Sequence, residues 1–226
     1  MIAYLFDLDG TLIRAGGAGA RALSTVFAAR HGVADACRGI RAHGRTDPAI
    51  VTDMFTSALG RAPTGTELDA VVADYLAELE RELDARPTFV VLPGADDVLT
   101  WLRARPDVRL GVATGNVEAG ARIKLARAGL GHHFGFGGYG CDSPRRPELV
   151  AWAARRSGAG AGDTLVVVGD TVLDVEAAKD NGALCVGVTT GGDDRATLEA
   201  CGADVVVDRL AELVPWHQAR FEAGRG

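Results

Sequence analysis

Residues 6–12 of the chain are Phe6-Asp7-Leu8-Asp9-Gly10-Thr11-Leu12, and they follow the apolar run Met1-Ile2-Ala3-Tyr4-Leu5. The unbroken apolar pattern predicts a strand over Ile2–Leu8 that is buried on both faces. Two carboxylates, spaced two residues apart, stand at the end of this strand. Such a pair can bind a hard cation such as Mg²⁺, and a carboxylate can also attack phosphorus. The alternative is an Asp-Gly turn with solvated charges, and the full run at the end of a first strand disfavours it.

The rest of the chain alternates between strand and helix patterns. Further strands are predicted at Arg109–Ala113, Leu165–Val168, Leu184–Val188 and Val205–Val207, with a short one near Phe134–Gly138. Helical spacing of apolar residues occurs at Ala95–Arg105, Val117–Gly129, Glu148–Arg156, Val172–Asn181 and Arg195–Cys201. This alternation predicts an α/β fold with a doubly wound, Rossmann-like parallel sheet.

One segment breaks the alternation. Between about Ala15 and Arg86 the sequence shows helical patterns only, at Arg21–Arg30, Pro48–Leu59 and Glu67–Leu83. Thr64, with Glu67 three residues later, is typical of a helix start. We therefore expect an all-helical cap domain at residues 15–90, inserted into a core formed by residues 1–14 and 91–226.

Composition limits the possible partners and location. The net charge of −6 argues against a nucleic-acid-binding protein, which would carry a basic face. Apolar residues make up 47% of the chain, enough for a full core, yet no apolar run is long enough to span a membrane. The four cysteines lack metal-ligand spacing, and the N-terminal run lacks a basic segment before it. We expect a cytoplasmic protein that binds neither nucleic acid nor membrane.

Three further polar motifs fall at or near the ends of predicted strands. They are Thr114-Gly115-Asn116, Arg145-Arg146-Pro147 and Gly169-Asp170-Thr171 with Asp174 four residues after Asp170. Each alone has an ordinary explanation: a strand–turn–helix connection, a solvated basic loop, or acidic residues that favour a helix N-terminus. In an open α/β sheet, however, ligands bind at the carboxyl ends of the strands. The motifs together therefore predict a single site.

The complete pattern resembles the haloacid dehalogenase superfamily with a helical cap, and within it the phosphoglycolate phosphatase-like and β-phosphoglucomutase-like members. The first motif of that family corresponds to Asp7-x-Asp9-Gly10-Thr11, the second to Thr114 and the fourth to Gly169-Asp170-Thr171-x-x-Asp174. The third is usually lysine followed by proline. Neither Lys124 nor Lys179 lies at that place, so Arg146 is assigned the role, with Arg145 as the second choice. Arginine keeps the charge but changes its geometry.

The resemblance implies a Mg²⁺-dependent phosphatase that acts on a small phosphorylated metabolite. Asp7 is then the nucleophile that forms an aspartyl phosphate, and Asp9 is the general acid and base. The resemblance also implies that Asp7, the backbone carbonyl of Asp9 and Asp170 bind Mg²⁺, and that Asp174 orients its neighbours. Asp9 argues against a dehalogenase, which needs no acid at that position.

The remaining predictions concern substrate binding. Thr114 and the backbone around it are expected to hold phosphate oxygens, together with Gly10, Gly115 and Asn116. In the cap, Arg45 or His43 is expected to meet a carboxylate or a second phosphate of the substrate. The adjacent His132 and His133 are expected to be solvated, because neighbouring residues do not share a face.

Several alternatives stay open at this stage. A β-phosphoglucomutase-like phosphosugar mutase carries the same four motifs. A catalytically silent binding protein with this fold would be expected to lose a carboxylate, and none is missing here. The sequence does not decide the substrate, the choice between monomer and homodimer, or whether Arg146 or Arg145 replaces the lysine.

Overall fold

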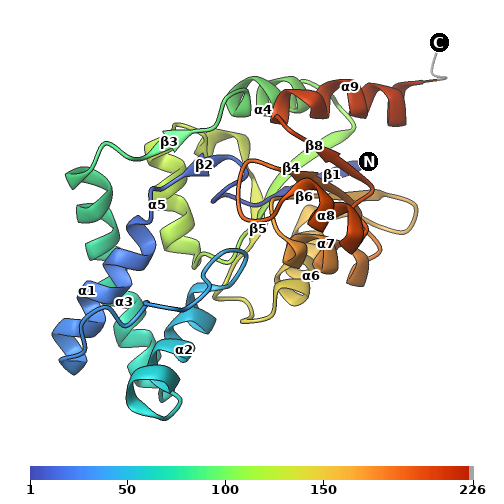
Figure 1. Cartoon of the computed structure of the whole chain (residues 1–226). Helices are drawn as coiled ribbons and strands as arrows, with labels where there is room; N and C mark the ends of the chain where they lie inside the picture. The colour runs from blue at the N-terminus through green and yellow to red at the C-terminus, as the bar shows by residue number, and fades with distance from the viewer. Residues whose placement is uncertain (224–226) are drawn as a thin grey trace.

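The structure, a computed structural model, describes residues 1–223 (Figure 1). Within these residues the main sheet has six parallel strands in the order β5-β4-β1-β6-β7-β8. The strands are β1 (Ile2–Phe6), β4 (Val108–Ala113), β5 (Phe136–Gly138), β6 (Thr164–Gly169), β7 (Leu184–Val188) and β8 (Val205–Val207). The predicted α/β fold with a parallel sheet is therefore confirmed.

Strand β1 lies at the centre of the sheet, and all five of its residues are buried. Phe6 pairs with Val112 of β4 on one side and with Val168 of β6 on the other. Because the strands are parallel and in this register, their carboxyl ends meet at the same edge. The residues that follow β1, β4 and β6 are thus brought together.

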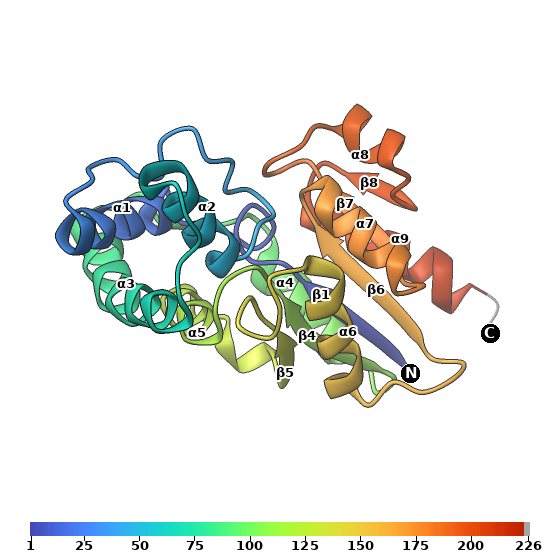
Figure 2. The same ribbon diagram turned by 90° about the horizontal axis from the view of Figure 1, so that it is seen from below.

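Helices cover both faces of the sheet, as Figure 2 shows for α4 and α6. Apolar side chains of α4 (Ala95–Arg103) and α5 (Glu118–Ala128) share one buried cluster with Tyr4 and Phe6 of β1. On the opposite face, α6 (Arg146–Ser157), α7 (Val172–Asp180) and α8 (Arg195–Cys201) pack in a second cluster with Leu5. The alternation of Phe6 and Leu5 between the faces follows from the two-residue period of a strand.

Three helices between β1 and β4 form a third buried cluster away from the sheet. They are α1 (Ala18–His31), α2 (Asp47–Leu59) and α3 (Gly65–Ala85). Helix α3 begins with the predicted capping box of Thr64 and Glu67 and buries a stripe with four-residue spacing. The stripe consists of Val71, Tyr75, Leu79 and Leu83. This helical segment has its own apolar core.

A short ribbon joins the helical segment to the sheet. Strand β2 (Ile13–Arg14) pairs antiparallel with β3 (Val90–Val91), so the outgoing and returning connections lie side by side. The ribbon lies next to the predicted boundaries at residues 15 and 90, which stay a prediction as domain limits.

The C-terminal part was not predicted in detail. Residues 210–222 form a 3₁₀ turn, Leu210–Glu212, helix α9, Leu213–His217, and a π-helical turn, Gln218–Glu222. Leu210 and Leu213 join the cluster of α4, and the hydroxyl of Tyr4 hydrogen-bonds Nδ1 of His217. Residues 224–226 of the predicted core lie outside the described residues. No helix within residues 1–223 has the length and hydropathy needed to cross a membrane.

Candidate active site

A pocket of about 550 Å³ lies over the carboxyl ends of β1, β4 and β6. It brings together nearly all residues that the sequence singled out, although they are spread over most of the chain. Its lining includes Asp7, Asp9, Gly10, His43, Arg45, Thr114, Gly115, Asn116, Arg146 and Asp170. Asp174 does not line the pocket but lies directly behind it, in the first turn of α7.

Three buried carboxylates meet at the floor of the pocket. Oxygen atoms of Asp7, Asp170 and Asp174 lie within 4.8 Å of one another. Burial raises the pKa of Asp7 to about 6, and burial with the nearby charge of Asp7 raises the pKa of Asp170 to about 8. Burial thus disfavours the ionised carboxylates, and a cation bound among them would favour their ionised form.

Asp170 is held in place by hydrogen bonds and by close backbone. Its Oδ1 accepts from the Thr11 hydroxyl at 3.1 Å, and its Oδ2 accepts from the Gly192 amide at 2.6 Å. A Cβ atom at Gly10 would lie 2.3 Å from Oδ2 of Asp170, and one at Gly191 only 1.9 Å away. Glycine is required at both places, because any side chain would displace the carboxylate.

Arg146 connects the carboxylates. Its side chain is 4% exposed, and Nη2 lies 3.0 Å from Oδ2 of Asp7 and 2.5 Å from Oδ1 of Asp174. Nη1 also donates to the carbonyl of Gly44 at 2.9 Å. Arg145 instead is exposed, stands just before α6 and pairs with Glu148 of that helix. Of the two arginines, Arg146 is the one that contacts Asp7.

Both carboxylate oxygens of Asp174 accept hydrogen bonds from the protein. Its Oδ2 accepts from the backbone amide of Thr171 at 3.0 Å and from the Thr171 hydroxyl at 2.8 Å, while its Oδ1 faces Arg146. The same contacts cap α7, which explains why an aspartate stands at the third helical position. Asp174 thereby fixes the guanidinium of Arg146 against Asp7.

Lys124 belongs to the site, although the sequence gave no sign of this. It lies in α5, is 5% exposed, and its Nζ contacts Oδ2 of Asp9 at 2.5 Å and Oδ1 of Asn116 at 2.6 Å. The amide of Asn116 donates to Oδ2 of Asp9 at 2.9 Å and to the Thr114 hydroxyl at 2.8 Å. Asp9 itself is 39% exposed toward the pocket. Its carboxylate is thus oriented from one side by an amide and an ammonium group.

The loop before α2 lies against the loop after β4. The amide of Asp47 donates to the Gly115 carbonyl at 2.8 Å, and the amide of Val117 donates to Oδ2 of Asp47 at 2.9 Å. A Cβ atom at Gly115 would lie 2.1 Å from the carbonyl oxygen of Arg45. The helical segment therefore closes directly over the phosphate-binding loop predicted at Thr114–Asn116.

The two predicted substrate-binding side chains of this loop, Arg45 and His43, differ in their exposure and in their contacts. Arg45 lines the pocket, but its guanidinium is paired with Asp53 in the second turn of α2. His43 is exposed, and its Cβ lies close to Gly192. Neither contact tests whether these residues meet a substrate, so that role stays a prediction.

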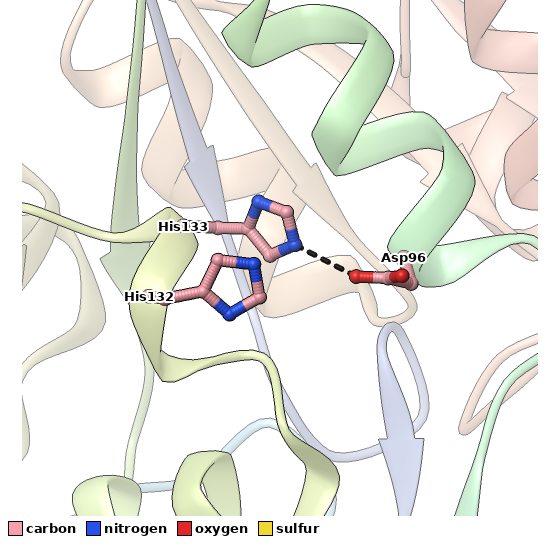
Figure 3. A group of neighbouring side chains, drawn as sticks. All are labelled: Asp96, His132 and His133. Atoms are coloured by element: carbon pink, nitrogen blue, oxygen red, sulfur yellow. Dashed lines mark hydrogen bonds and ion pairs between the residues drawn. The ribbon is translucent and has the colours of Figure 1, made fainter.

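His132 and His133 lie outside this pocket, and the expectation that both are solvated is wrong for His133. His133 is buried, and its Nε2 contacts Oδ1 of Asp96 at 2.8 Å (Figure 3). His132 is exposed and its Nδ1 hydrogen-bonds the Gly129 carbonyl at 2.9 Å. In the 3₁₀ turn Gly131–His133 the two rings lie close together, with centroids 3.9 Å apart, but only His133 turns inward, where it contacts Asp96 and Phe134.

Known proteins resemble the chain over nearly its whole length. Residues 2–182 match the haloacid dehalogenase-like hydrolase family. The "Probable phosphatase IndB" of Dickeya dadantii is 31% identical over 213 residues, which cover 93% of this chain and 90% of that protein. A phosphoglycolate phosphatase of Pseudomonas syringae pv. syringae is 28% identical over 93% of this chain and 78% of its own length. A solved hydrolase from Pseudomonas syringae superposes with a TM-score of 0.72 at 24% identity, over 97% of this chain and 99% of that one.

Proposed function

The chain belongs to the haloacid dehalogenase-like hydrolases and is a phosphatase, and we propose that it hydrolyses a small phosphomonoester through an aspartyl phosphate on Asp7 with Mg²⁺ as cofactor. The observation that carries this proposal is the position of Asp7. It is buried at the end of the central strand, one oxygen faces Arg146, and Asp170 lies beside it. This environment fixes the carboxylate for in-line attack on phosphorus.

The donor set fits Mg²⁺. The residues that would hold the ion are Asp7, Asp170 and the backbone carbonyl of Asp9, which are all oxygen donors of the kind that Mg²⁺ prefers. The raised pKa values of Asp7 and Asp170 point the same way, because both arise from burying carboxylates together. When bound, the cation supplies positive charge that offsets the phosphate oxygens and the carboxylates.

The proton transfers fall to Asp9. In the first step an oxygen of Asp7 bonds to phosphorus, the bond to the leaving oxygen breaks, and that oxygen takes the proton of Asp9. In the second step water attacks phosphorus, its proton passes to Asp9, and phosphate leaves Asp7. The contacts of Asp9 with Asn116 and Lys124 support this role, since they hold the carboxylate at the pocket side of Asp7.

The loop after β4 is proposed to hold the phosphoryl oxygens. The Thr114 hydroxyl is buried at the pocket floor, and Gly115 and Asn116 line the pocket beside it. Gly10 allows the first loop to approach Asp170 closely. Together with Arg146 these groups place donors and positive charge around a bound phosphate.

We assign residues 15–90 the role of a cap. The three helices have their own buried cluster, and the ribbon β2–β3 connects them to the sheet at a single place. The loop at residues 43–47 is in contact with the catalytic loops, which corresponds to a closed arrangement that excludes water from the reaction.

A panel of phosphate esters, assayed for released phosphate with and without Mg²⁺, tests the proposal. Phosphate release that requires Mg²⁺ and is lost in Asp7→Asn supports it, whereas full activity in excess chelator contradicts it. Product analysis separates the phosphosugar mutase, because a mutase would convert a sugar phosphate into its isomer without releasing phosphate. A catalytically silent binding protein would bind esters without either reaction.

A further inference from the structure

The pocket continues beyond the carboxylates into a chamber formed by the helical segment. This leaving-group chamber, as we call it, is lined by residues 15–20, Leu23, Ile40, Ile50 and Tyr75. Residues 15–20 are all alanine or glycine, so the start of α1 presents almost no side-chain volume. The whole pocket of about 550 Å³ lies within the range of sites that hold ligands of sugar or nucleoside size. A two-carbon leaving group such as glycolate would fill little of it.

The buried and half-buried cations of the pocket already have partners in the protein. Lys124 contacts Asp9 and Asn116, Arg146 contacts Asp7 and Asp174, and Arg45 pairs with Asp53. Arg14 and His43 are exposed at the rim, and Arg14 donates to the Thr190 carbonyl. A carboxylate or second phosphate in the chamber would therefore find no free buried cation within the described residues.

Anionic groups face the same space. Asp9 and the buried Asp47 both line the pocket, and burial raises the pKa of Asp47 to about 6. Above that pH an anionic leaving group would lie near the ionised Asp47 carboxylate, and like charges repel. The electrostatics of the chamber thus disfavour an acidic leaving group and accept a neutral one.

Tyr75 supplies a polar group that the protein itself does not use. Its side chain is 1% exposed and lines the pocket from α3, and no hydrogen bond to its hydroxyl is found within residues 1–223. A Cβ atom at Gly19 would lie 3.4 Å from this hydroxyl, which places it at the wall formed by α1. The hydroxyl itself is open to the pocket, so it is available to donate to or accept from a hydroxyl of a ligand.

We infer that the leaving group of the substrate is a neutral, hydroxyl-bearing alcohol of about sugar size, with Tyr75 as a specificity-determining residue. The inference rests on the proposed phosphatase function and narrows it. Tyr75 hydrogen-bonds a hydroxyl of the leaving group, and Asp47 disfavours a carboxylate. Phosphoglycolate, which the names of several relatives suggest, is then a poor substrate for this chain.

Matched pairs of esters test whether the enzyme disfavours a charged leaving group. The pairs are 2-hydroxyethyl phosphate with phosphoglycolate, and glycerol 3-phosphate with 3-phosphoglycerate, and phenyl phosphate checks that the enzyme is active. We expect kcat/KM to be about ten-fold or more higher for the neutral member of each pair. Equal values, or a preference for the acids, would overturn the inference while leaving the phosphatase intact. Failure to hydrolyse any ester, phenyl phosphate included, would overturn the proposed function and the inference with it.

Substitutions test the role of Tyr75. In Tyr75→Phe the ratio of kcat/KM for ribose 5-phosphate to that for phenyl phosphate should fall about five-fold, which is the effect of one lost hydrogen bond. Tyr4→Phe is the matched control, because it removes a hydroxyl that is bonded to His217 outside the pocket. It should lower Tm and leave the ratio unchanged. An unchanged ratio in Tyr75→Phe would contradict the inference.

A second variant narrows the chamber without removing any contact. Gly19→Ala adds a methyl group near the Tyr75 hydroxyl in the first turn of α1, where alanine suits a helix better than glycine. Tm should therefore hold or rise. The activity toward ribose 5-phosphate should fall while that toward 2-hydroxyethyl phosphate persists, and an equal loss for both would argue against a chamber for large leaving groups.

Discussion

Nζ of Lys124 lies 2.5 Å from Oδ2 of Asp9, so the only buried ammonium group within residues 1–223 touches the carboxylate to which we assign the proton transfers. The contact crosses from α5 to the loop after β1. The sequence does not predict this contact, because Lys124 lies away from the place of the family's third motif. The arrangement gives this protein an arginine at Asp7 and a lysine at Asp9.

The first prediction concerns Lys124. Lys124→Met should lower kcat about ten- to a hundred-fold, because a hydrogen bond to a charged group is lost and Asp9 is free to turn away. Lys179→Met is the control, since Lys179 is exposed and bonds the Cys201 carbonyl at the surface. Steady-state kinetics of both variants measure the effect. A wild-type kcat in Lys124→Met would show that Lys124 does not support catalysis.

The second prediction separates the two neighbouring arginines. Arg146→Ala should lose most activity and lower Tm, because it leaves Asp7 and Asp174 buried without their cation. Arg145→Ala removes an exposed pair with Glu148 and should change Tm little. If Arg145→Ala lost more activity than Arg146→Ala, Arg145 and not Arg146 would take the place of the third-motif lysine.

The third prediction concerns pH and Mg²⁺. The folded-state pKa values of Asp7 and Asp170 are raised, to about 6 and about 8, above the usual value for an unfolded chain, which is about 3.9. The stability from these groups is therefore present below pH ~4 and is lost as pH rises through about 6 and about 8.

Mg²⁺ should reverse this loss, because it binds the ionised carboxylates. We expect Mg²⁺ to raise the free energy of unfolding more at pH 8 than at pH 5, as measured by chemical denaturation. Asp170→Asn should be more stable than the wild type without metal and should respond little to Mg²⁺. A Mg²⁺ effect that is equal at both pH values would contradict the assignment of these carboxylates as ligands.

The fourth prediction concerns the contact between the helical segment and the sheet. In Gly115→Ala the new methyl group would meet the Arg45 carbonyl oxygen at 2.1 Å, so the loop at residues 43–47 must move. We expect a loss of stability of about 1–3 kcal/mol and a raised KM. Gly65→Ala, where no atom lies within 4 Å of the added carbon, should alter stability by less than about 0.5 kcal/mol. Equal Tm values for the two variants would show that this contact does not hold the loop.

The sequence predicts the floor of the site because that floor depends on strand ends. Asp7, Thr114 and Asp170 each follow a buried apolar run, and parallel pairing must bring such ends to one edge. Lys124 could not be predicted in this way. It lies in the middle of α5, and its contact with Asp9 depends on how that helix packs against the sheet.

Other parts of the fold could not be predicted, because their local sequence shows too little of the pattern of a strand or a helix. The strands β2 and β3 are only two residues long, so they show no periodicity and exist only because the two connections run together. Helix α9, Leu213–His217, is short and contains Pro215, which weakens a helical pattern. The burial of His133 depends on a 3₁₀ turn that brings its ring to Asp96 of α4, a residue distant in the sequence.

The identity of the nucleophile is tested most directly by trapping the covalent intermediate. The enzyme is mixed with a phosphate ester and Mg²⁺, quenched in acid within one turnover, and digested for peptide mass spectrometry. We predict a phosphoryl group on Asp7 in the N-terminal peptide, absent from Asp7→Asn. Turnover without any phosphoryl group on Asp7, or with one on another residue, would contradict the account.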